Sequence, residues 1–406
     1  MKRSGSLTVK IMPPDCEHCK YFTLAIIIFS FNPFVASHEK GGEKPEWASR
    51  VIGDATRSKD STDILATDKN LIYQEKSLLL PDVLDIIRCK DANVVERSNC
   101  VVQCIDFHPH SNILLTAGFD KTLRLFNIDG INNEKIQSVC FEDLPISMAK
   151  FTADGKEIIV SGKRQYFYVF DLEKASIEKV HGLHGRREKS YENFAVSPCN
   201  KFIAFVGQAG SILVVCRKSK QLLHVLKMNS FVRSLEFSHD GAFLFSNGGD
   251  DRIYKWNMKN FTCDSVFHDD GCIKGTALAI SQASKKSSSY LAAGSESGVV
   301  NIYKLAESSE FKGVPEKALM NLTTFVDGIV FNPDNQVMAM YSRTLKNSLR
   351  LVHLPTMRVF SNWPTAQTPL RHVQTLAFNA FGDFMAVGND KGAVLLFQLP
   401  HYVKQQ

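Results

Sequence analysis

The side chains whose types and spacing could do chemistry gather in one basic stretch of the chain. Interrupted by two glycines, it contains Lys179, His184, Arg186, Arg187 and Lys189. A second short run adds Arg217, Lys218 and Lys220. Lysine and arginine bind phosphate oxygens with little regard to base sequence, so these residues would suit contacts to RNA or to an acidic protein partner. An ordinary solvated loop explains the same pattern, and the residues alone do not separate these interpretations.

The sequence contains no arrangement that predicts catalysis. The run from Gly294 to Gly298 is similar to the turn that carries a hydrolase nucleophile, but its central residue is Glu296 where that motif requires serine. Neither a phosphate-binding loop of the G-x-x-x-x-G-K type nor an H-E-x-x-H zinc motif occurs. Cys16 and Cys19 supply at most half of a zinc site. We therefore expect no enzyme, no metal, no cofactor and no small-molecule substrate.

Composition and charge limit the class of protein. A chain of 406 residues with 44% hydrophobic and 22% charged side chains is typical of a globular protein. Its net charge of +6 is small for a dedicated nucleic-acid binder. Abundant phenylalanine and glycine among short apolar runs favour an all-β architecture. The cysteines lie inside such runs, which indicates free thiols in a reducing compartment.

An internal repeat organises the chain beyond residue 100. An apolar-x-apolar strand followed by a turn recurs, and the last apolar residue of each copy is Phe107, Phe151, Val196, Phe237, Ile280, Phe331 or Phe378. Successive copies are 41 to 51 residues apart. This period, with four short strands in each unit, is typical of WD-repeat blades, and seven units are a common number for a closed ring. The sequence therefore predicts an all-β, seven-bladed WD-repeat β-propeller.

The residues that mark a WD blade are present in only some units. We expect turn aspartates that accept backbone hydrogen bonds at Asp120 and Asp250, and Asp171 follows a strand-ending phenylalanine. Units without that turn aspartate have Ala209, Ser297 or Lys391 at the same position. Because the Gly-His pair of the usual polar network is also missing, cohesion should come from apolar packing between blades. Trp256, which ends a third strand, should pack between neighbouring sheets.

The two ends of the repeat region predict how the ring closes. Residues 83–89 alternate apolar with polar, and we expect them to form the outer strand of the last blade, so that no sheet edge is left open. The propeller would then occupy residues 83–400, with a tail at 401–406. Residues 39–82 are polar and read as a largely disordered linker or arm.

Residues 1–38 form an atypical apolar segment. The run from Tyr21 to Phe31 is too short for an ordinary membrane span. A signal peptide, a partner-binding strand and an artefact of the gene model each account for it.

Several segments of the carboxyl half resemble one WD-repeat family, the U3 small nucleolar RNA-associated protein 18 family of the small-subunit processome. The most specific segments are 349–355 (LRLVHLP) and 359–364 (VFSNWP), and the others are 247–256 (NGGDDRIYKW), 269–275 (DDGCIKG) and 294–303 (GSESGVVNIY). The resemblance covers most of the chain. Residues 1–37 depart from it, since family members carry a long, highly charged arm there.

The resemblance implies a non-catalytic scaffold in the nucleus and nucleolus, needed to process pre-rRNA to the small-subunit rRNA. The implied partners are other propeller proteins of a processome subcomplex, the U3 small nucleolar ribonucleoprotein and pre-rRNA. The resemblance implies no contact with a membrane. The alternative from another class is a generic WD-repeat adaptor, such as a ubiquitin-ligase substrate receptor or a trafficking scaffold.

Overall fold

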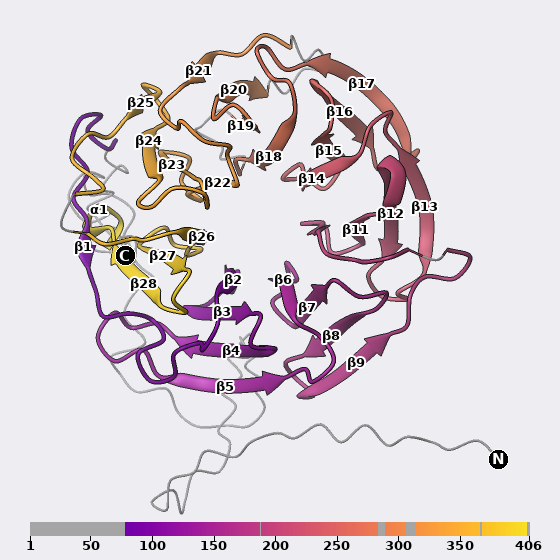
Figure 1. Ribbon diagram of the computed structural model, residues 1–406, viewed down its shortest axis with the longest axis horizontal. Coiled ribbons are helices and arrows are strands. Elements are labelled where there is room, and N and C mark those ends of the chain that lie inside the picture. Colours follow the sequence, from indigo (N-terminus) through magenta and orange to yellow (C-terminus); the bar gives the residue numbers. More distant parts are fainter. Residues whose placement is uncertain (1–77, 187, 283–288, 306–312, 366–367, 404–406) are drawn as a thin grey trace, which may run out of the picture. The chain divides into compact units, whose positions relative to one another are not determined.

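The chain folds into a ring of seven four-stranded antiparallel sheets, seen along the ring axis in Figure 1. This computed structural model describes residues 78–403, apart from 187, 283–288, 306–312 and 366–367. The predicted all-β, seven-bladed propeller is therefore confirmed. Residues 1–38 and most of 39–82 lie outside the described residues, and so do the predictions made for them.

The blades follow one another along the chain, each running from the centre of the ring to its rim. Blade 1 contains β2 (Val102–Phe107), β3 (Ile113–Gly118), β4 (Thr122–Asn127) and β5 (Lys135–Cys140). Blade 2 contains β6 (Ile146–Phe151), β7 (Glu157–Gly162), β8 (Phe167–Asp171) and β9 (Ser176–Val180). Blade 3 contains β10 (Phe194–Val196), β11 (Phe202–Val206), the 3-10 turn η2 (Gln208–Gly210), β12 (Ser211–Cys216) and β13 (Leu222–Lys227).

The second half of the ring repeats this arrangement. Blade 4 contains β14 (Val232–Phe237), β15 (Phe243–Gly248), β16 (Arg252–Asn257) and β17 (Thr262–His268). Blade 5 contains β18 (Gly275–Ile280), β19 (Ser289–Ser295), β20 (Val300–Leu305) and β21 (Lys317–Leu319). Blade 6 contains β22 (Gly328–Phe331), β23 (Val337–Tyr341), β24 (Leu349–His353) and β25 (Arg358–Val359). Blade 7 contains β26 (Val373–Phe378), β27 (Phe384–Asn389), β28 (Val394–Gln398) and β1 (Ile87–Arg88).

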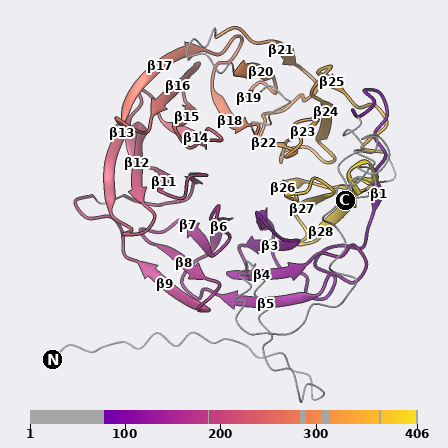
Figure 2. The same cartoon turned by 180° about the vertical axis from the view of Figure 1, so that it is seen from behind.

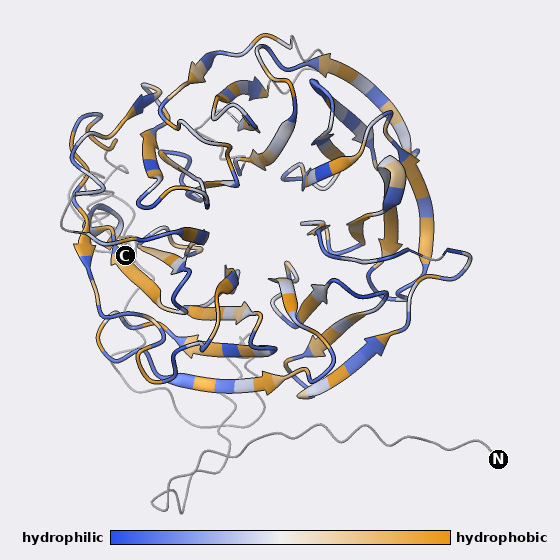
Figure 3. Cartoon of the chain, in the orientation of Figure 1, coloured by the Kyte–Doolittle hydropathy of each residue, from blue (hydrophilic) through white to orange (hydrophobic). Residues whose placement is uncertain are grey.

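The position of a strand within its blade determines its hydropathy pattern. The two middle strands are covered on both faces by neighbouring blades, so β3 and β12 are buried along almost their whole length. The outermost strands touch solvent, and β17 is mostly exposed. Figure 3 shows hydrophilic and hydrophobic residues mixed along these outer strands. Each residue used above to define the repeat is the last residue of an innermost strand, as Phe107 is of β2.

The first and last strands of the propeller meet in blade 7. Ile87 pairs with Gln398 and Arg88 with Phe397, and both views of the ring place β1 beside β28 (Figure 2). Closure through the predicted segment is thus confirmed, but the regular strand is shorter than residues 83–89. Leu84 instead sits in the core, where its backbone N–H and C=O both bond the Asn362 side chain.

The ordered chain extends past both predicted boundaries of the propeller. Leu79 is buried and its backbone N–H donates to Gln336 Oε1 at 2.8 Å. At the other end, Pro400–Val403 forms the short helix α1, and Tyr402 is buried instead of belonging to a free tail. Both boundaries therefore move outward, because Leu79 and Tyr402 anchor the flanking segments.

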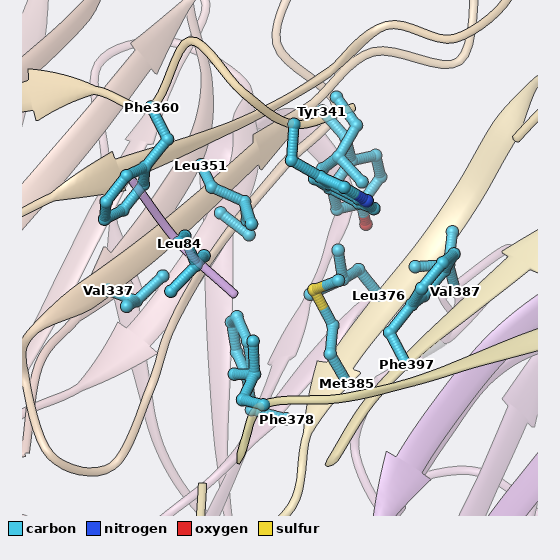
Figure 4. Packing of buried hydrophobic residues seen from close by; sticks show 14 of the residues in the cluster. Leu84, Val337, Tyr341, Leu351, Phe360, Leu376, Phe378, Met385, Val387 and Phe397 are labelled. Carbon is cyan, nitrogen blue, oxygen red and sulfur yellow. The ribbon is translucent and has the colours of Figure 1, made fainter. Parts of the chain in front are cut away.

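Apolar packing between blades supplies the core of the ring. The described residues contain seven buried apolar clusters, each shared by two adjacent blades. Figure 4 shows the cluster between blades 6 and 7, where Leu84 lies near Val337, Leu351 and Phe360. Burying apolar surface contributes roughly 25 cal/mol per Å². The sequence predicted that apolar packing holds the blades together where the WD marker residues are missing, and such packing is present at every blade boundary of the described residues.

Antiparallel strand order divides the loops between two faces of the ring. The loops that lead from one blade to the next emerge on the same side as the turns between second and third strands. We call this side the crossover face. The turns between first and second strands, and between third and fourth strands, lie on the opposite face.

Candidate functional site

Parts of the two basic segments singled out in the sequence line one hollow at the boundary between blades 2 and 3. Residues 181–193 connect β9 to β10, and residues 217–221 form the turn between β12 and β13. Residues 178–186 and 219–221 together line a hollow of about 850 Å³. The structure thus brings together cations that are about thirty residues apart in the sequence.

Half of the predicted contact residues are held in ion pairs. Arg217 Nη2 lies 2.9 Å from Asp154 Oδ2, and Lys220 Nζ lies 3.5 Å from Glu157 Oε2. Both acids belong to blade 2, and the Arg217 side chain is only 11% exposed. These pairs join blade 2 to blade 3. Arg217 and Lys220 therefore contribute to the blade boundary, in addition to lining or flanking the hollow.

Lys179 and Arg186 are also engaged within the protein. Lys179 Nζ lies 4.0 Å from the centre of the Tyr166 ring and 3.5 Å from Asp143 Oδ2. Arg186 Nη1 donates to Glu188 Oε1 at 3.2 Å. Glu188 is buried, and its other oxygen accepts the Gln208 backbone N–H at 2.8 Å.

Three predicted contact residues are exposed and have no ion pair in the described part of the chain. They are His184, Lys189 and Lys218. Arg187, the remaining member of the predicted set, lies outside the described residues. Of the predicted set, these exposed side chains are the best placed to meet a phosphate or a carboxylate of a partner.

The basic loop is anchored more firmly than its glycines indicate. Gly182 and Gly185 adopt φ values of +77° and +83°, which glycine reaches without steric cost. Between and beyond them, Leu183 and Tyr191 are buried in the cluster shared by blades 2 and 3. Two glycines in one loop favour flexibility, but two apolar anchors fix the course of this loop.

The marker residues of the WD blades have different roles from one blade to another. Asp120 Oδ1 accepts the Thr122 N–H at 3.3 Å, and its Oδ2 accepts from Ser98 and Arg124 at 2.8 and 2.5 Å. Burial alone would raise the pKa of Asp120, but these hydrogen bonds outweigh it and lower the pKa. Asp250 Oδ2 instead accepts the Tyr254 hydroxyl at 3.0 Å.

The other two markers fix a turn and a blade boundary. Asp171 Oδ1 accepts the backbone N–H groups of Glu173 and Lys174 at 3.0 and 3.1 Å. Trp256 is 5% exposed, lies in the cluster shared by blades 3 and 4, and donates from Nε1 to Ser246 Oγ at 2.8 Å.

Sequence reasoning missed the residue that replaces the turn aspartate in blade 7. Asn389 Oδ1 accepts the N–H groups of Lys391 and Ala393, both at 3.0 Å. The substitute lies two positions before Lys391, so comparing equivalent positions could not reveal it.

Sequence reasoning also missed the charges in the central channel. The innermost strands surround a hollow of about 600 Å³, whose lining includes Lys150 and Glu236. Burial raises the pKa of nearby Asp106 to about 6, although its Oδ2 accepts the Phe151 N–H at 2.8 Å. All three residues occupy the middle position of the apolar-x-apolar pattern that defines the repeat, which is the signal that could have identified them.

Two further observations apply to the described residues alone. No group of three or more histidine, cysteine, aspartate or glutamate side chains there could hold a metal ion. No helix in that part of the chain is long and apolar enough to cross a membrane.

Comparison with known proteins gives matches along most of the chain. The WD domain, G-beta repeat model matches residues 93–127 and 220–257, in blades 1 and 4 with their flanking segments. The U3 small nucleolar RNA-associated protein 18 homolog of Arabidopsis thaliana is 42% identical over 90% of this chain and 68% of its own length. The Homo sapiens homolog is 34% identical over 90% of this chain and 66% of its length.

A fungal relative shows a similar match. The probable U3 small nucleolar RNA-associated protein 18 of Schizosaccharomyces pombe is 34% identical over 88% of this chain and 71% of its own length. The chain thus spans about two thirds of the length of these relatives.

Proposed function

Because the chain belongs to the U3 small nucleolar RNA-associated protein 18 family, we propose that it is a non-catalytic scaffold of the small-subunit processome. The observation that carries this proposal is the similarity to a relative of that name along 90% of the chain. In this role the protein works in the nucleolus, where pre-rRNA is processed to the small-subunit rRNA. Its partners are the U3 small nucleolar ribonucleoprotein, the pre-rRNA and other propeller proteins of a processome subcomplex.

The architecture suits a scaffold because a closed ring presents fixed surfaces. Each blade boundary is packed with buried apolar side chains, so loops on either face keep their positions relative to one another. Fixed loops lose little freedom when a partner binds, which favours affinity. The exposed side chains of His184, Lys189 and Lys218 are our candidates for contact with RNA or an acidic partner.

A generic WD-repeat adaptor, such as a ubiquitin-ligase receptor or trafficking scaffold, is the alternative function. The names of the relatives above do not favour it. The two functions differ in where the protein is found after centrifugation of a cell extract.

Sedimentation of the tagged full-length chain on a density gradient tests the proposal. We expect the protein in fractions that contain large pre-ribosomal particles and U3 RNA, and we expect nuclease treatment to release it to lighter fractions. Sedimentation only as a small complex in the light fractions, unaffected by nuclease, would support the adaptor function instead.

A further inference from the structure

The crossover face has a strongly acidic sector over blades 4 and 5. Five loops of this sector, residues 228–231, 249–251, 269–274, 296–299 and 320–327, contain six Asp or Glu residues and one lysine. In sequence, the nine other loops of the same face contain eight Asp or Glu and twelve Lys or Arg. Asp269 is buried and the Asp327 side chain is only 8% exposed, so the acids that reach the surface of this sector are Asp250, Asp251, Asp270 and Glu296.

The same sector exposes three large apolar side chains. Phe231 is 52% exposed, Ile273 is 77% exposed and Met320 is 74% exposed. Each comes from a different loop of the sector. Isolated exposed apolar residues are normal on a protein surface, so these three gain significance only together with the exposed carboxylates of the same loops.

Backbone hydrogen bonds join these loops into one continuous surface. Within blade 4, Gly249 N–H donates to Phe231 C=O at 2.9 Å, and Asp269 N–H donates to Asp251 C=O at 2.8 Å. In blade 5, Glu296 N–H donates to Lys274 C=O at 3.0 Å, and Val326 N–H donates to Ser295 C=O at 3.2 Å. The two blades are neighbours in the ring (Figure 1).

Hydrogen bonds from two buried side chains hold the loop that carries Ile273 in place. Asn301 Nδ2 donates to Asp269 Oδ1 at 2.6 Å and to the Asp270 C=O at 2.8 Å. The Tyr303 hydroxyl donates to Asp269 Oδ1 at 2.5 Å, and all three side chains are buried. Ile273 is thus held out toward solvent by an ordered base, so a partner would not have to order this loop.

Gly249 leaves room for the Phe231 ring beside its turn. A Cβ atom at Gly249 would lie 2.3 Å from a carbon of that ring, so a larger residue there would displace the ring from its present position. Ile273 is therefore presented from an ordered loop, and Phe231 lies exposed beside the Gly249 turn.

We propose that this acidic and apolar sector docks a segment of a partner protein that carries lysine or arginine beside large apolar side chains. Asp270 and Glu296 are exposed, and Asp251 is 46% exposed, so these carboxylates can meet cations of the partner. Glu296 contacts Lys274 at 3.0 Å. Asp251 contacts His268 Nδ1 at 2.9 Å and Arg252 at 4.0 Å, and the side chains of all these pairs are solvent-exposed. Exposed pairs of this kind contribute little and can be exchanged for cations of a partner. The sector is distinct from the basic site of blades 2 and 3, and the inference goes beyond the proposed function.

Fluorescence anisotropy with the full-length chain and labelled short peptides tests this proposal. The probes are a peptide of alternating lysine and leucine, one of alternating glutamate and leucine, one of alternating lysine and serine, and an oligouridine RNA. We expect only the lysine-leucine peptide to bind well, with an affinity that falls as salt is raised. Two double variants, Ile273→Ser with Met320→Ser and Asp270→Lys with Glu296→Lys, should each weaken binding at least about tenfold.

Matched controls lie on the opposite face, in the turn between β4 and β5. Ile131 is 68% exposed and Glu134 is exposed, so Ile131→Ser and Glu134→Lys repeat the two chemical changes away from the sector. They should leave binding unchanged. The proposal is overturned if the lysine-leucine peptide does not bind, if the glutamate-leucine peptide or the RNA binds as tightly, or if controls and sector variants behave alike.

Discussion

Trp256 links blades 3 and 4 through a single side chain. Its ring lies in their shared apolar cluster, and its indole N–H is satisfied by Ser246. Removing a buried aromatic side chain typically costs about 3–5 kcal/mol. We expect Trp256→Ala to lower the free energy of unfolding by that amount in denaturant titrations, whereas Ile136→Ala, at a position 53% exposed, should change it by under about 0.5 kcal/mol. A loss below about 1 kcal/mol for Trp256→Ala would contradict the packing described.

Asp106 should make stability depend on pH. Burial raises the pKa of this carboxyl from 3.8 to about 6, so between those values the folded chain holds a proton that the unfolded chain has lost. The free energy of unfolding therefore falls as pH rises through this window. Asp106→Asn keeps an oxygen for the Phe151 N–H but does not ionise.

Denaturant titrations of Asp106→Asn at several pH values measure this effect. The stability of the variant relative to the native chain should rise between about pH 4 and pH 6 and then level off. The comparison cancels the titration of acids that do not interact with Asp106. A difference that stays constant with pH would show that the pKa of Asp106 is not raised in the folded chain.

The exposed cations Lys189 and Lys218 allow a clean test of the basic site. Their charge can be reversed without breaking an ion pair of the described residues, unlike that of Arg217. If they bind phosphate, the double change to glutamate should weaken crosslinking to single-stranded RNA. The salt slope of binding should also fall by roughly 0.7 for each phosphate that the variant no longer neutralises.

Lys259→Glu supplies the control for this test, since Lys259 is exposed in the blade 4 turn equivalent to that of Lys218. Loss of one protein partner without any change in RNA crosslinking would point to an acidic protein at the site. If neither RNA crosslinking nor particle association changes, the basic loop is only a solvated connector.

The strand that closes the ring depends on a few buried contacts. Leu84 is 2% exposed whereas neighbouring Val83 is 57% exposed. We expect Leu84→Ala to cost about 2–5 kcal/mol of unfolding free energy and Val83→Ala to cost little. A chain beginning at Asp91 should also expose the edge of β28 and aggregate, whereas one beginning at Glu75 should not. Equal melting temperature and solubility for these two chains would contradict closure through β1.

The sequence was sufficient to predict which segments form blades, because the innermost strand of each is marked by the same apolar pair and turn. It was less informative where an element depends on distant contacts. The Leu79 backbone N–H donates to Gln336 Oε1, and the two residues are 257 positions apart in the sequence. No local sequence pattern reveals such a contact. The propeller boundary was therefore placed too late, and β1 was expected to be longer than Ile87–Arg88.

The ring as a whole explains why the candidate site was only partly predictable. Two basic segments could be singled out in the sequence, since charge runs are visible without a structure, and parts of both line one hollow. It could not show that Arg217 and Lys220 meet Asp154 and Glu157, because those acids belong to the preceding blade. The channel charges were overlooked because they occupy the variable position of an apolar repeat.

Recovery of U3 RNA with the tagged full-length chain tests the scaffold function most directly. The tagged protein is purified from nuclear extract, and the U3 RNA that comes with it is quantified against another abundant small nucleolar RNA. We predict that U3 RNA is strongly enriched over the reference RNA. Equal recovery of the two RNAs, at the level of an untagged extract, would contradict a role in the U3-containing processome.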